Sequence, residues 1–466
     1  MDAVAIRDLF RSALLFAAAA FFIQAGLKAV EPAPTELRTN PGYRFLTEKP
    51  YLPPDFDWET FDAAGKNWPE PLRAQAEQMT LEGRRKMAFA RYGLVGRPND
   101  PTKPLQYVVD REGQWTMNCF ACHGGTVPDG EGGSRVWPGA PNSHFALQTL
   151  TEETRLAKPD LQKPLSRMDL GSVFVPLGSS NGTTNAVMFG VLLMAYRDAD
   201  LTLHKNRSMP PMVHHDMDAP PWWHFKRKKM MYIDGFAAHS ARGLMQFMLV
   251  PQNGPEKFRE WERDFEDVLA YITSIEAPRY PFSIDHSLAE RGRIAFNREC
   301  AQCHGTYGAN SKYPEKLIPI DEVGTDRVRL QALTATHRSA YGQSWFAHFG
   351  KLPNINDPQG YVAPPLDGVW ASAPYFHNGS VPTLWHVLHP KQRPIVWTRV
   401  GNGYDRERGG PVIETAEELP STVTAGWQRR QYFDTRNFGK SAAGHEFPNA
   451  LSEEEKLAVL EYLKTL

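Results

Sequence analysis

Cysteine is scarce in this chain: it has four cysteines in 466 residues, and all four fall within two five-residue motifs. No thiol is left over for a disulfide or for a reactive nucleophile elsewhere. An excess of charge of one sign is also missing, because 52 Lys and Arg residues balance 53 Asp and Glu residues. No overall field favours nucleic acid or an anionic membrane surface, so nucleic acid is not expected as a partner.

The two cysteine motifs are Cys-Phe-Ala-Cys-His at 119–123 and Cys-Ala-Gln-Cys-His at 300–304. This pattern is typical of c-type haem attachment, in which two thiols add to the haem vinyl groups and the histidine supplies an axial nitrogen to iron. A thioredoxin-like dithiol and half a zinc site are the alternatives, and the histidine in both copies argues against them. The sequence predicts two covalently bound haem c groups, attached at Cys119, Cys122, Cys300 and Cys303, with His123 and His304 as iron ligands.

A long apolar run of membrane-spanning length is absent. The run at about 13–23 is shorter than the roughly 20 apolar residues that a span needs. Arg7 and Arg11 precede it, and Pro-rich sequence follows from Glu31. We expect residues 1–30 to be an export signal or, since no clean small-x-small cleavage site follows, an N-terminal anchor. Both interpretations predict an exported protein, periplasmic in a bacterium, with membrane anchoring in the second case.

Stretches that alternate like strands are few, so we expect a mainly α protein with long loops and little β. A Gly-Arg pair and a following phenylalanine precede each motif, at 83–89 and at 292–296. An amphipathic segment ends each copy, at 265–272 and at 456–463, which predicts two tandem cytochrome-c-like domains. The prolines at 278 and 281 favour a linker between them. The expected ranges are an irregular Pro-rich arm at 31–69, a first domain at 70–280 and a second at 283–466.

A family resemblance rests on residues 363–370 (Ala-Pro-Pro-Leu-Asp-Gly-Val-Trp) and on the stretch 373–384 that follows. These look like a signature of the bacterial dihaem cytochrome c peroxidase superfamily, and the chain is most similar to its rubber oxygenase branch. Pro141-Asn142-Ser143, Thr184-Asn185-Ala186 and residues 320–326 support the resemblance, which covers most of 75–466. It implies a haem-dependent oxidoreductase of oxygenase or peroxidase type.

Within this resemblance, His445 matches a C-terminal histidine that serves as distal ligand of the second haem. His377, His386 and His389 compete with it, and a surface loop is the structural alternative. The stretch 385–393 has no methionine, which favours two histidine ligands and electron transfer at the second haem. The resemblance also implies a calcium ion between the domains, with Asn185, Ser372 and Pro374 at the matching positions.

For the first haem, no histidine lies between His144 and His204, where the family commonly has a detachable distal ligand. We therefore expect an open distal face, at which dioxygen or peroxide can bind. The distal pocket is expected from residues 220–246, and its candidates are Trp222, Trp223, His239 and Gln246. Ile233 replaces the family tryptophan that lies between the haems, so Trp222 or Trp223 is either its substitute or a packing residue.

Two functions remain open. One is an enzyme that activates dioxygen or peroxide at the first haem, acting on an apolar small molecule or exchanging electrons with a periplasmic redox partner. The other is a non-enzymatic carrier with two six-coordinate haems. A histidine at the first iron, from His214, His215, His224 or His239, would favour the carrier.

Overall fold

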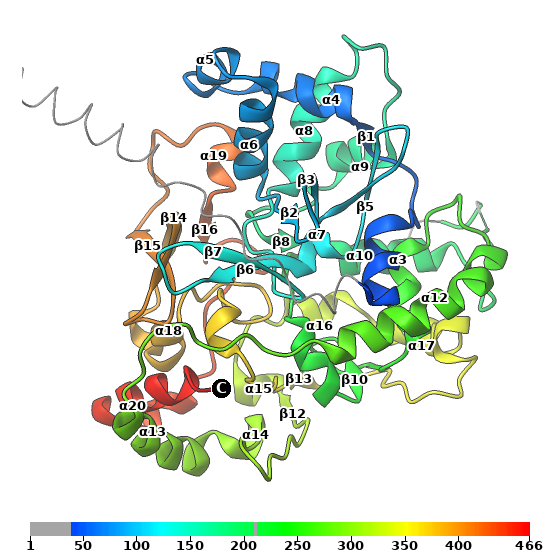
Figure 1. Cartoon of the computed structure of the whole chain (residues 1–466). Helices are drawn as coiled ribbons and strands as arrows, with labels where there is room; N and C mark the ends of the chain where they lie inside the picture. Colours follow the sequence, from blue (N-terminus) through cyan, green and yellow to red (C-terminus); the bar gives the residue numbers. More distant parts are fainter. Residues whose placement is uncertain (1–38, 205, 209–211) are drawn as a thin grey trace, which may run out of the picture.

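The computed structural model describes residues 39–204, 206–208 and 212–466 (Figure 1). Helices make up 41% of the structure and strands 15%. Helix predominates as expected, but small sheets are more numerous than the sequence indicates. The predicted export signal or anchor in residues 1–30 lies outside the described residues. Over the ranges that are described, no helix combines the length and apolar character required to cross a bilayer.

The elements of the first half follow in chain order. Its helices are α3 (Pro41–Glu48), α4 (Trp58–Ala63), η1 (Ala64–Asn67), α5 (Leu72–Glu77), α6 (Leu81–Tyr92), α7 (Phe120–His123), α8 (Leu147–Ala157), α9 (Arg167–Phe174), α10 (Ala186–Ala195), η2 (Trp222–Arg227), α11 (Ala241–Leu244), η3 (Met245–Met248) and α12 (Pro255–Ser274). Its strands are β1 (Phe56–Asp57), β2 (Gly96–Arg97), β3 (Asp100–Pro104), β4 (Tyr107–Val109), β5 (Gln114–Met117), β6 (Gly124–Pro128), β7 (Ser134–Pro138), β8 (Thr183–Thr184), β9 (Met217–Asp218), β10 (Met230–Met231) and β11 (Ala237–Ala238).

The second half is built in the same mixed way. Its helices are α13 (His286–Glu299), α14 (Ala301–His304), α15 (Ile320–Val323), α16 (Val328–Ala332), α17 (Ala335–Gly342), η4 (Trp345–Ala347), η5 (Val369–Ala371), α18 (Leu384–Leu388), η6 (Pro390–Gln392), α19 (Gly426–Arg429), η7 (Phe447–Ala450) and α20 (Glu453–Leu463). Its strands are β12 (Leu317–Pro319), β13 (Gly360–Val362), β14 (Val396–Asp405), β15 (Gly410–Ala416) and β16 (Tyr432–Asp434).

Two helix pairs hold the two Cys-x-x-Cys-His motifs. In the second half, α13 packs along α20, and Gly292 makes the crossing close: a Cβ there would lie 1.9 Å from the carbonyl oxygen of Ala458. In the first half, α12 packs along α3, and a Cβ on Gly42 would lie 2.3 Å from the carbonyl oxygen of Asp267. Figure 1 shows α3 beside α12, and α13 beside α20 at the opposite end of the molecule. Glycine at both crossings lets the backbones approach.

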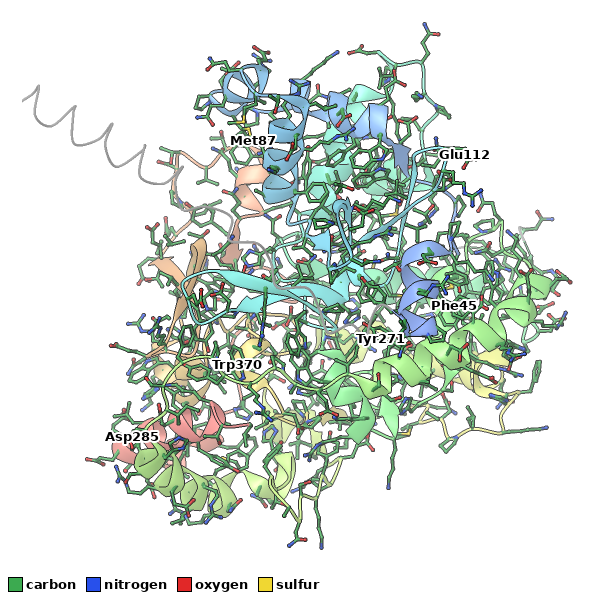
Figure 2. All side chains as sticks on the ribbon, viewed as in Figure 1. Phe45, Met87, Glu112, Tyr271, Asp285 and Trp370 are labelled. Carbon is green, nitrogen blue, oxygen red and sulfur yellow. The ribbon has the colours of Figure 1, made fainter. Side chains whose placement is uncertain are left out.

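This pairing bears on the arm predicted at 31–69. The helix α3 lies within that segment and packs against α12, as α13 packs against α20. Asn40 caps α3 by accepting from the amide of Gly42 at 2.9 Å, so the segment is a helix and not an irregular arm. Figure 2 labels Phe45 on α3 and Tyr271 on α12, and the rings of Tyr43 and Tyr271 contact each other between the two helices with centroids 5.8 Å apart. The sequence similarity between the two halves does not include α3, because the Gly-Arg pair and phenylalanine that match residues 292–296 lie in α6.

The two halves share one hydrophobic core. The main buried cluster runs from Tyr43 to Leu463 and combines residues of both predicted domains. Trp345 and Phe346 of the second half, for example, contact Phe258 of α12 with ring centroids 6.0 Å apart. Residues of β16 and α19 also return to the first half, where the amide of Asn181 donates to Arg430 at 2.8 Å. The predicted linker at 276–282 therefore separates the halves in sequence but not in space.

A second buried cluster lies around the three-stranded sheet β1-β5-β4. Its centre is Trp115, whose ring stacks on Phe61 at 4.6 Å. This cluster combines Tyr92 of α6 and Leu150 of α8 with Ala121 of the first motif. The sheet therefore belongs to the scaffold of the first site.

Candidate functional site

The first Cys-x-x-Cys-His motif forms a single helical turn, α7. Asn118 starts it by accepting from the amide of Phe120 at 2.9 Å. Asn142, from the predicted Pro-Asn-Ser motif, ends it: its backbone amide donates to the carbonyl of Cys122 at 2.8 Å, and its side chain donates to that of Ala121 at 3.2 Å. The turn thus presents Cys119, Cys122 and His123 together.

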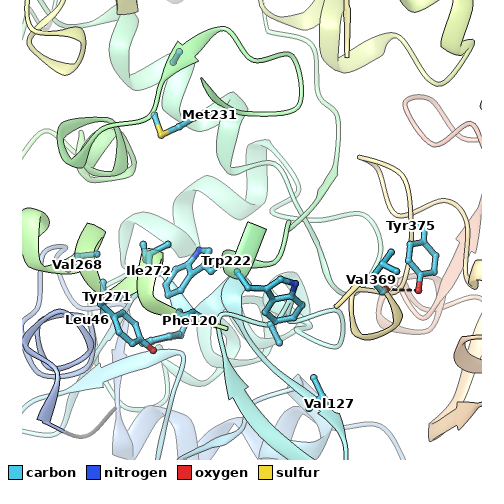
Figure 3. Packing of buried hydrophobic residues seen from close by; sticks show 14 of the residues in the cluster. Leu46, Phe120, Val127, Trp222, Met231, Val268, Tyr271, Ile272, Val369 and Tyr375 are labelled. Atoms are coloured by element: carbon cyan, nitrogen blue, oxygen red, sulfur yellow. Dashed lines mark hydrogen bonds between the residues drawn. The ribbon is translucent and has the colours of Figure 1, made fainter. Parts of the chain in front are cut away.

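The ring of His123 is fixed by its two neighbours. Its Nδ1 donates to the carbonyl oxygen of Pro220 at 3.0 Å, which leaves Nε2 as the nitrogen for a metal. The indole of Trp222 stacks on the imidazole, with centroids 4.9 Å apart and planes at 26°. Figure 3 shows Trp222 packed near Phe120 of the motif. Burial lowers the pKa of His123 to about 4, so the ring is neutral and able to bind a metal at neutral pH.

The second motif repeats this design at the start of α14. The Nδ1 of His304 donates to the carbonyl oxygen of Pro364 at 2.9 Å, again leaving Nε2 free. Tyr307 steadies the same turn, because its hydroxyl donates to the carbonyl of His304 at 2.9 Å and accepts from the amide of Leu366 at 2.6 Å. Pro364 and Leu366 belong to the signature at 363–370, so that signature positions the histidine.

His445 lies opposite His304. Their ring centroids are 6.1 Å apart and their planes differ by 64°. Two imidazoles bound to opposite faces of one metal, with metal–nitrogen distances of about 2.0 Å, have centroids roughly 6 Å apart. Burial lowers the pKa of His445 to about 3, and its Nδ1 is buried with no hydrogen-bond partner. The pair fits a metal held between two neutral imidazoles.

The loop that carries His445 is held from two sides. The amide of His445 donates to Val323 at 2.6 Å, and Gly444 lies so close to Gly324 that a Cβ would be 2.2 Å from its carbonyl carbon. Arg393 donates to the carbonyls of Ala442 and Gly444 at 2.6 and 2.7 Å. His445 itself has φ +48°, a left-handed conformation that costs free energy outside glycine. The surrounding contacts therefore impose its position.

The competing histidines have other contacts. His386 hydrogen-bonds Thr383 at 2.7 Å, and His389 hydrogen-bonds Glu453 at 3.0 Å. His377 packs against Tyr361 with ring centroids 4.6 Å apart and planes tilted by 44°. Of these histidines, His445 is the one that faces the ring of His304.

The thiols fit covalent attachment to haem better than redox or nucleophilic chemistry. Burial raises the pKa of Cys119 and Cys300 to about 12 and that of Cys122 to about 11. Reactive and redox-active cysteines have a lowered pKa in electropositive surroundings. All four cysteines are free of disulfides in the structure. The donor set at each motif, two neutral thiols and one oriented imidazole, matches the groups that hold haem c.

Sequence reasoning missed a buried polar group beside the first motif. Arg399 of β14 donates to the carbonyl of Ser143, and Arg399 and Asp218 shift each other's pKa. Burial lowers the pKa of Arg399 to about 10, and burial next to Arg399 lowers the pKa of His144 to about 3. His144 follows the Pro-Asn-Ser motif directly, which is the only sequence signal for this group; Arg399 is more than 250 residues further along the chain.

The four predicted distal-pocket residues do not converge on one point. Trp222 lies on the ring of the proximal ligand His123, and Trp223 donates its indole N–H to the carbonyl of Asp367 at 2.7 Å. His239 hydrogen-bonds the carbonyl of Lys228 at 3.0 Å. Gln246 lines an apolar cavity of about 50 Å³ beside α10, together with Tyr232 and Tyr341.

The other histidines considered for the first iron hydrogen-bond backbone carbonyls, although the Nε2 atoms of His215 and His239 are buried without a hydrogen-bond partner. His214 and His224 hydrogen-bond backbone carbonyls through Nε2, at 3.2 and 2.8 Å. His215 does so through Nδ1 at 2.9 Å. Among the described residues, no histidine ring pairs with His123 as His445 pairs with His304.

The calcium site remains a prediction. The amide of Asn185 donates to the carbonyl of Pro176, and the hydroxyl of Ser372 donates to that of Val369 at 2.9 Å. Within the described ranges, no three His, Cys, Asp or Glu residues group as metal ligands.

A family model described as "RoxA-like, cytochrome c-like" matches residues 360–398. This range contains Pro364 and Arg393, the residues that position His304 and the His445 loop. The chain therefore contains a cytochrome c-like domain, which implies haem c.

The chain is also similar to two proteins of Sinorhizobium fredii. It is 28% identical to the uncharacterized protein y4iM over 277 residues, which are 54% of this chain and 62% of y4iM. It is 29% identical to the uncharacterized protein y4iJ over 261 residues, 42% of each chain. The match thus spans less than two thirds of the length of either relative.

Proposed function

We propose that this protein is an exported dihaem c-type cytochrome oxidoreductase, with one haem at each Cys-x-x-Cys-His motif. The first haem is the site that activates dioxygen or peroxide, and the second transfers electrons. The observation that carries the proposal is the difference between the two proximal histidines: His304 has His445 opposite it, whereas His123 has no described histidine in that position.

Haem, when bound, supplies one-electron chemistry and, where one face is open, a coordination position for a small molecule. At the second motif, His304 and His445 would hold the iron of a bound haem between two imidazoles, and the contacts with Val323 and Arg393 fix the loop that carries His445. That arrangement suits electron transfer, because neither ligand has to move.

At the first motif, the protein orients one imidazole, His123, and surrounds the site with buried polar groups. His144 and Asp218 are buried residues that could hold or move a proton there, and Arg399 supplies a buried positive charge beside them. Buried groups of this kind are common where bound oxygen species are protonated. A peroxide- or oxygen-activating site is therefore better supported at the first motif than at the second.

The remaining parts of the proposal rest on the sequence. We propose a periplasmic location with the N-terminal segment as export signal or anchor, and either an apolar small-molecule substrate or a periplasmic redox partner. The apolar cavity beside Gln246, between α10 and α17, supports the apolar substrate.

Spectroscopy of the purified holoprotein tests the proposal. We expect two haem c groups per chain, one low-spin with two histidine ligands and one that changes its absorption and spin-resonance spectra with carbon monoxide, peroxide or dioxygen. Two low-spin haems that bind none of these ligands would overturn the enzymatic function and leave a periplasmic electron carrier. A single haem per chain would overturn the dihaem assignment itself.

A further inference from the structure

The helix α9 (Arg167–Phe174) has its polar and apolar faces reversed. Its buried residues are Asp169 and Ser172, whereas Leu170, Val173 and Phe174 are exposed at 51%, 58% and 80%. A helix at the surface of a globular protein normally turns its apolar residues towards the core. Over residues 164–176, every exposed residue is apolar, and we call this set the α9 strip: Pro164, Leu165, Leu170, Val173, Phe174 and Pro176.

The buried polar residues hold α9 in this orientation. Lys158, at the end of α8, forms a buried ion pair with Asp169 and donates to the carbonyl of Asp55 at 2.6 Å. The side chain of Gln148 in α8 donates to the carbonyl of Ser172 at 3.4 Å. Turning the apolar face inward would leave the buried Lys158 ammonium without its counter-charge, which is costly. The fold therefore keeps the apolar face of α9 outside.

The α9 strip is continuous along the helix. Leu170 precedes Val173 and Phe174 by three and four positions, a spacing that places the three side chains on one face. Leu165 directly precedes the N-cap, and Leu170 is the fourth residue after it; a hydrophobic staple joins these two positions. A Cβ on Gly171 would meet no atom within 4 Å, so no described part of the chain covers this side of the helix.

The N-terminal segment can bring a bilayer to the strip. Arg167, the first residue of α9, lies 3.8 Å from Asp55. Residues 39–55 contain the helix α3 and short extended stretches, so residue 39 lies within about 40 Å of this point. Residues 24–38 join it to the apolar run at 13–23 and can span at most about 50 Å. A chain anchored by that run therefore keeps the strip within reach of the same bilayer.

We propose that the α9 strip is a membrane-contact face, whose apolar side chains enter the bilayer that holds the N-terminal anchor. It rests on the anchor form of the proposed function and not on any reaction at the haem sites. Contiguous exposed apolar patches mark contacts with membranes or proteins. Protein interfaces surround such a patch with a polar rim, whereas residues 164–176 expose no polar side chain. Acyl chains need no hydrogen-bonding partner, so a bilayer fits this surface better.

The test uses the full-length holoprotein and phosphatidylcholine vesicles, with an environment-sensitive fluorophore attached at Val173→Cys or at Ile294→Cys. These positions are matched, because both side chains are 58% exposed. Figure 1 shows α9 near the top of the molecule and α13, which carries Ile294, at its lower end. We expect a blue shift of the emission and quenching by nitroxide-labelled lipid at position 173, and neither change at position 294. Protein without the added cysteine gives the background labelling.

Serine substitutions then show whether the strip acts as a unit. Leu170→Ser together with Phe174→Ser should reduce the quenching at position 173 to the level at position 294, because burial of these side chains drives the contact. Leu457→Ser changes a comparably exposed leucine of α20 and should have no effect. Since the strip carries no exposed charge, vesicles containing phosphatidylglycerol should give the same quenching as phosphatidylcholine alone.

Four results would overturn the membrane-contact face. One is a protein that sediments with the vesicles while the label at position 173 remains in water, so that the anchor acts alone. Another is a protein that does not bind vesicles at all. A blue shift without vesicles would assign the strip to a second copy of the chain if it grows with protein concentration, and to residues 1–38 of the same chain if it does not. Failure of the proposed enzymatic function would look different: carbon monoxide and peroxide would bind to neither haem, whatever the label reports.

Discussion

The imidazoles of His304 and His445 face each other with centroids 6.1 Å apart, although 141 positions separate them in sequence. Each ring is oriented independently: His304 by the carbonyl of Pro364, and His445 by a loop that Arg393 and Val323 hold. The fold itself therefore holds two imidazoles at the separation expected for two histidine ligands of one metal.

Replacing His445 by Ala should convert the second haem from low spin to high spin, because one axial position becomes free. The variant should still contain two haems, since attachment depends on the cysteines. Carbon monoxide should then bind to the second haem as well as to the first, which absorption spectra would show. His286→Ala, at an exposed position at the start of α13, is the matched control. An unchanged low-spin signal in His445→Ala would exclude His445 as the ligand.

Replacing Arg393 by Lys should loosen the His445 loop, because an ammonium group cannot donate to Ala442 and Gly444 in the fork geometry of a guanidinium. Leaving buried carbonyls unsatisfied costs about 1–3 kcal/mol each, so we expect unfolding in urea at a lower midpoint. The low-spin fraction of the second haem should fall in parallel. Arg436→Lys alters a half-exposed pair with Asp434 and serves as control. Loss of stability with a fully low-spin haem would show that Arg393 does not position His445.

Asp234 is completely buried between Arg329 and Arg338, which approach its carboxylate at 3.3 and 2.9 Å. Replacing it by Asn leaves two buried guanidinium groups without a counter-charge. Removing one partner of a buried ion pair typically costs about 3–5 kcal/mol, and we expect a loss of that order in equilibrium unfolding. Asp434→Asn, in the partly exposed pair with Arg436, should cost less than about 1 kcal/mol. Equal effects of the two changes would contradict this prediction.

Gly292 and Gly42 are expected to be sensitive to the smallest substitution. A Cβ at Gly292 would lie 1.9 Å from the Ala458 carbonyl, so α13 and α20 would have to move apart. Overpacking of this kind costs about 1–3 kcal/mol, and Gly42→Ala should act similarly through α12. Gly171→Ala, in the open on α9, should instead raise stability by about 0.5–1 kcal/mol because alanine favours helix. Thermal unfolding of the three variants distinguishes these outcomes.

Buried neutral histidines should make the protein sensitive to acid. Burial, with Lys228 and Arg227 nearby, lowers the pKa of His224 to about 3 in the folded state, against 6.5 as its ordinary value. Its contribution to stability is present above pH 6.5. It is lost as the pH falls towards 3, because the unfolded state then binds the extra proton, with a slope of at most about 1.4 kcal/mol per pH unit.

His224→Gln keeps a donor for the Asp367 carbonyl but does not titrate. The free energy of unfolding, measured from pH 7 to pH 4, should depend less steeply on pH in this variant. The same slope in variant and wild type would show that His224 is not the group responsible.

The sequence by itself determined the chemistry of attachment. All four cysteines lie in Cys-x-x-Cys-His motifs, and covalent haem attachment is the simplest interpretation of this pattern. Two thiols and a histidine so close in the chain can reach one haem. The amphipathic segment at 456–463 falls within α20 as predicted, and a capping box of Ser452 and Glu455 begins this helix, since a helix start is a local property. The prediction of His445 as a ligand came from a family resemblance. The structure adds the geometry, in which the His445 ring lies opposite the ring of His304.

Only the tertiary structure decided which residues surround each site. The sequence placed Trp222 in a distal pocket, whereas the fold stacks it on His123, because the carbonyl of Pro220 holds that histidine beside η2. It also predicted an irregular arm at 31–69, whereas Gly42 brings the helix α3 of that segment against α12. Arg399, His144 and Asp218 meet through chain segments far apart in sequence. Contacts of this kind depend on how helices cross and loops return, and no local pattern of residues encodes them.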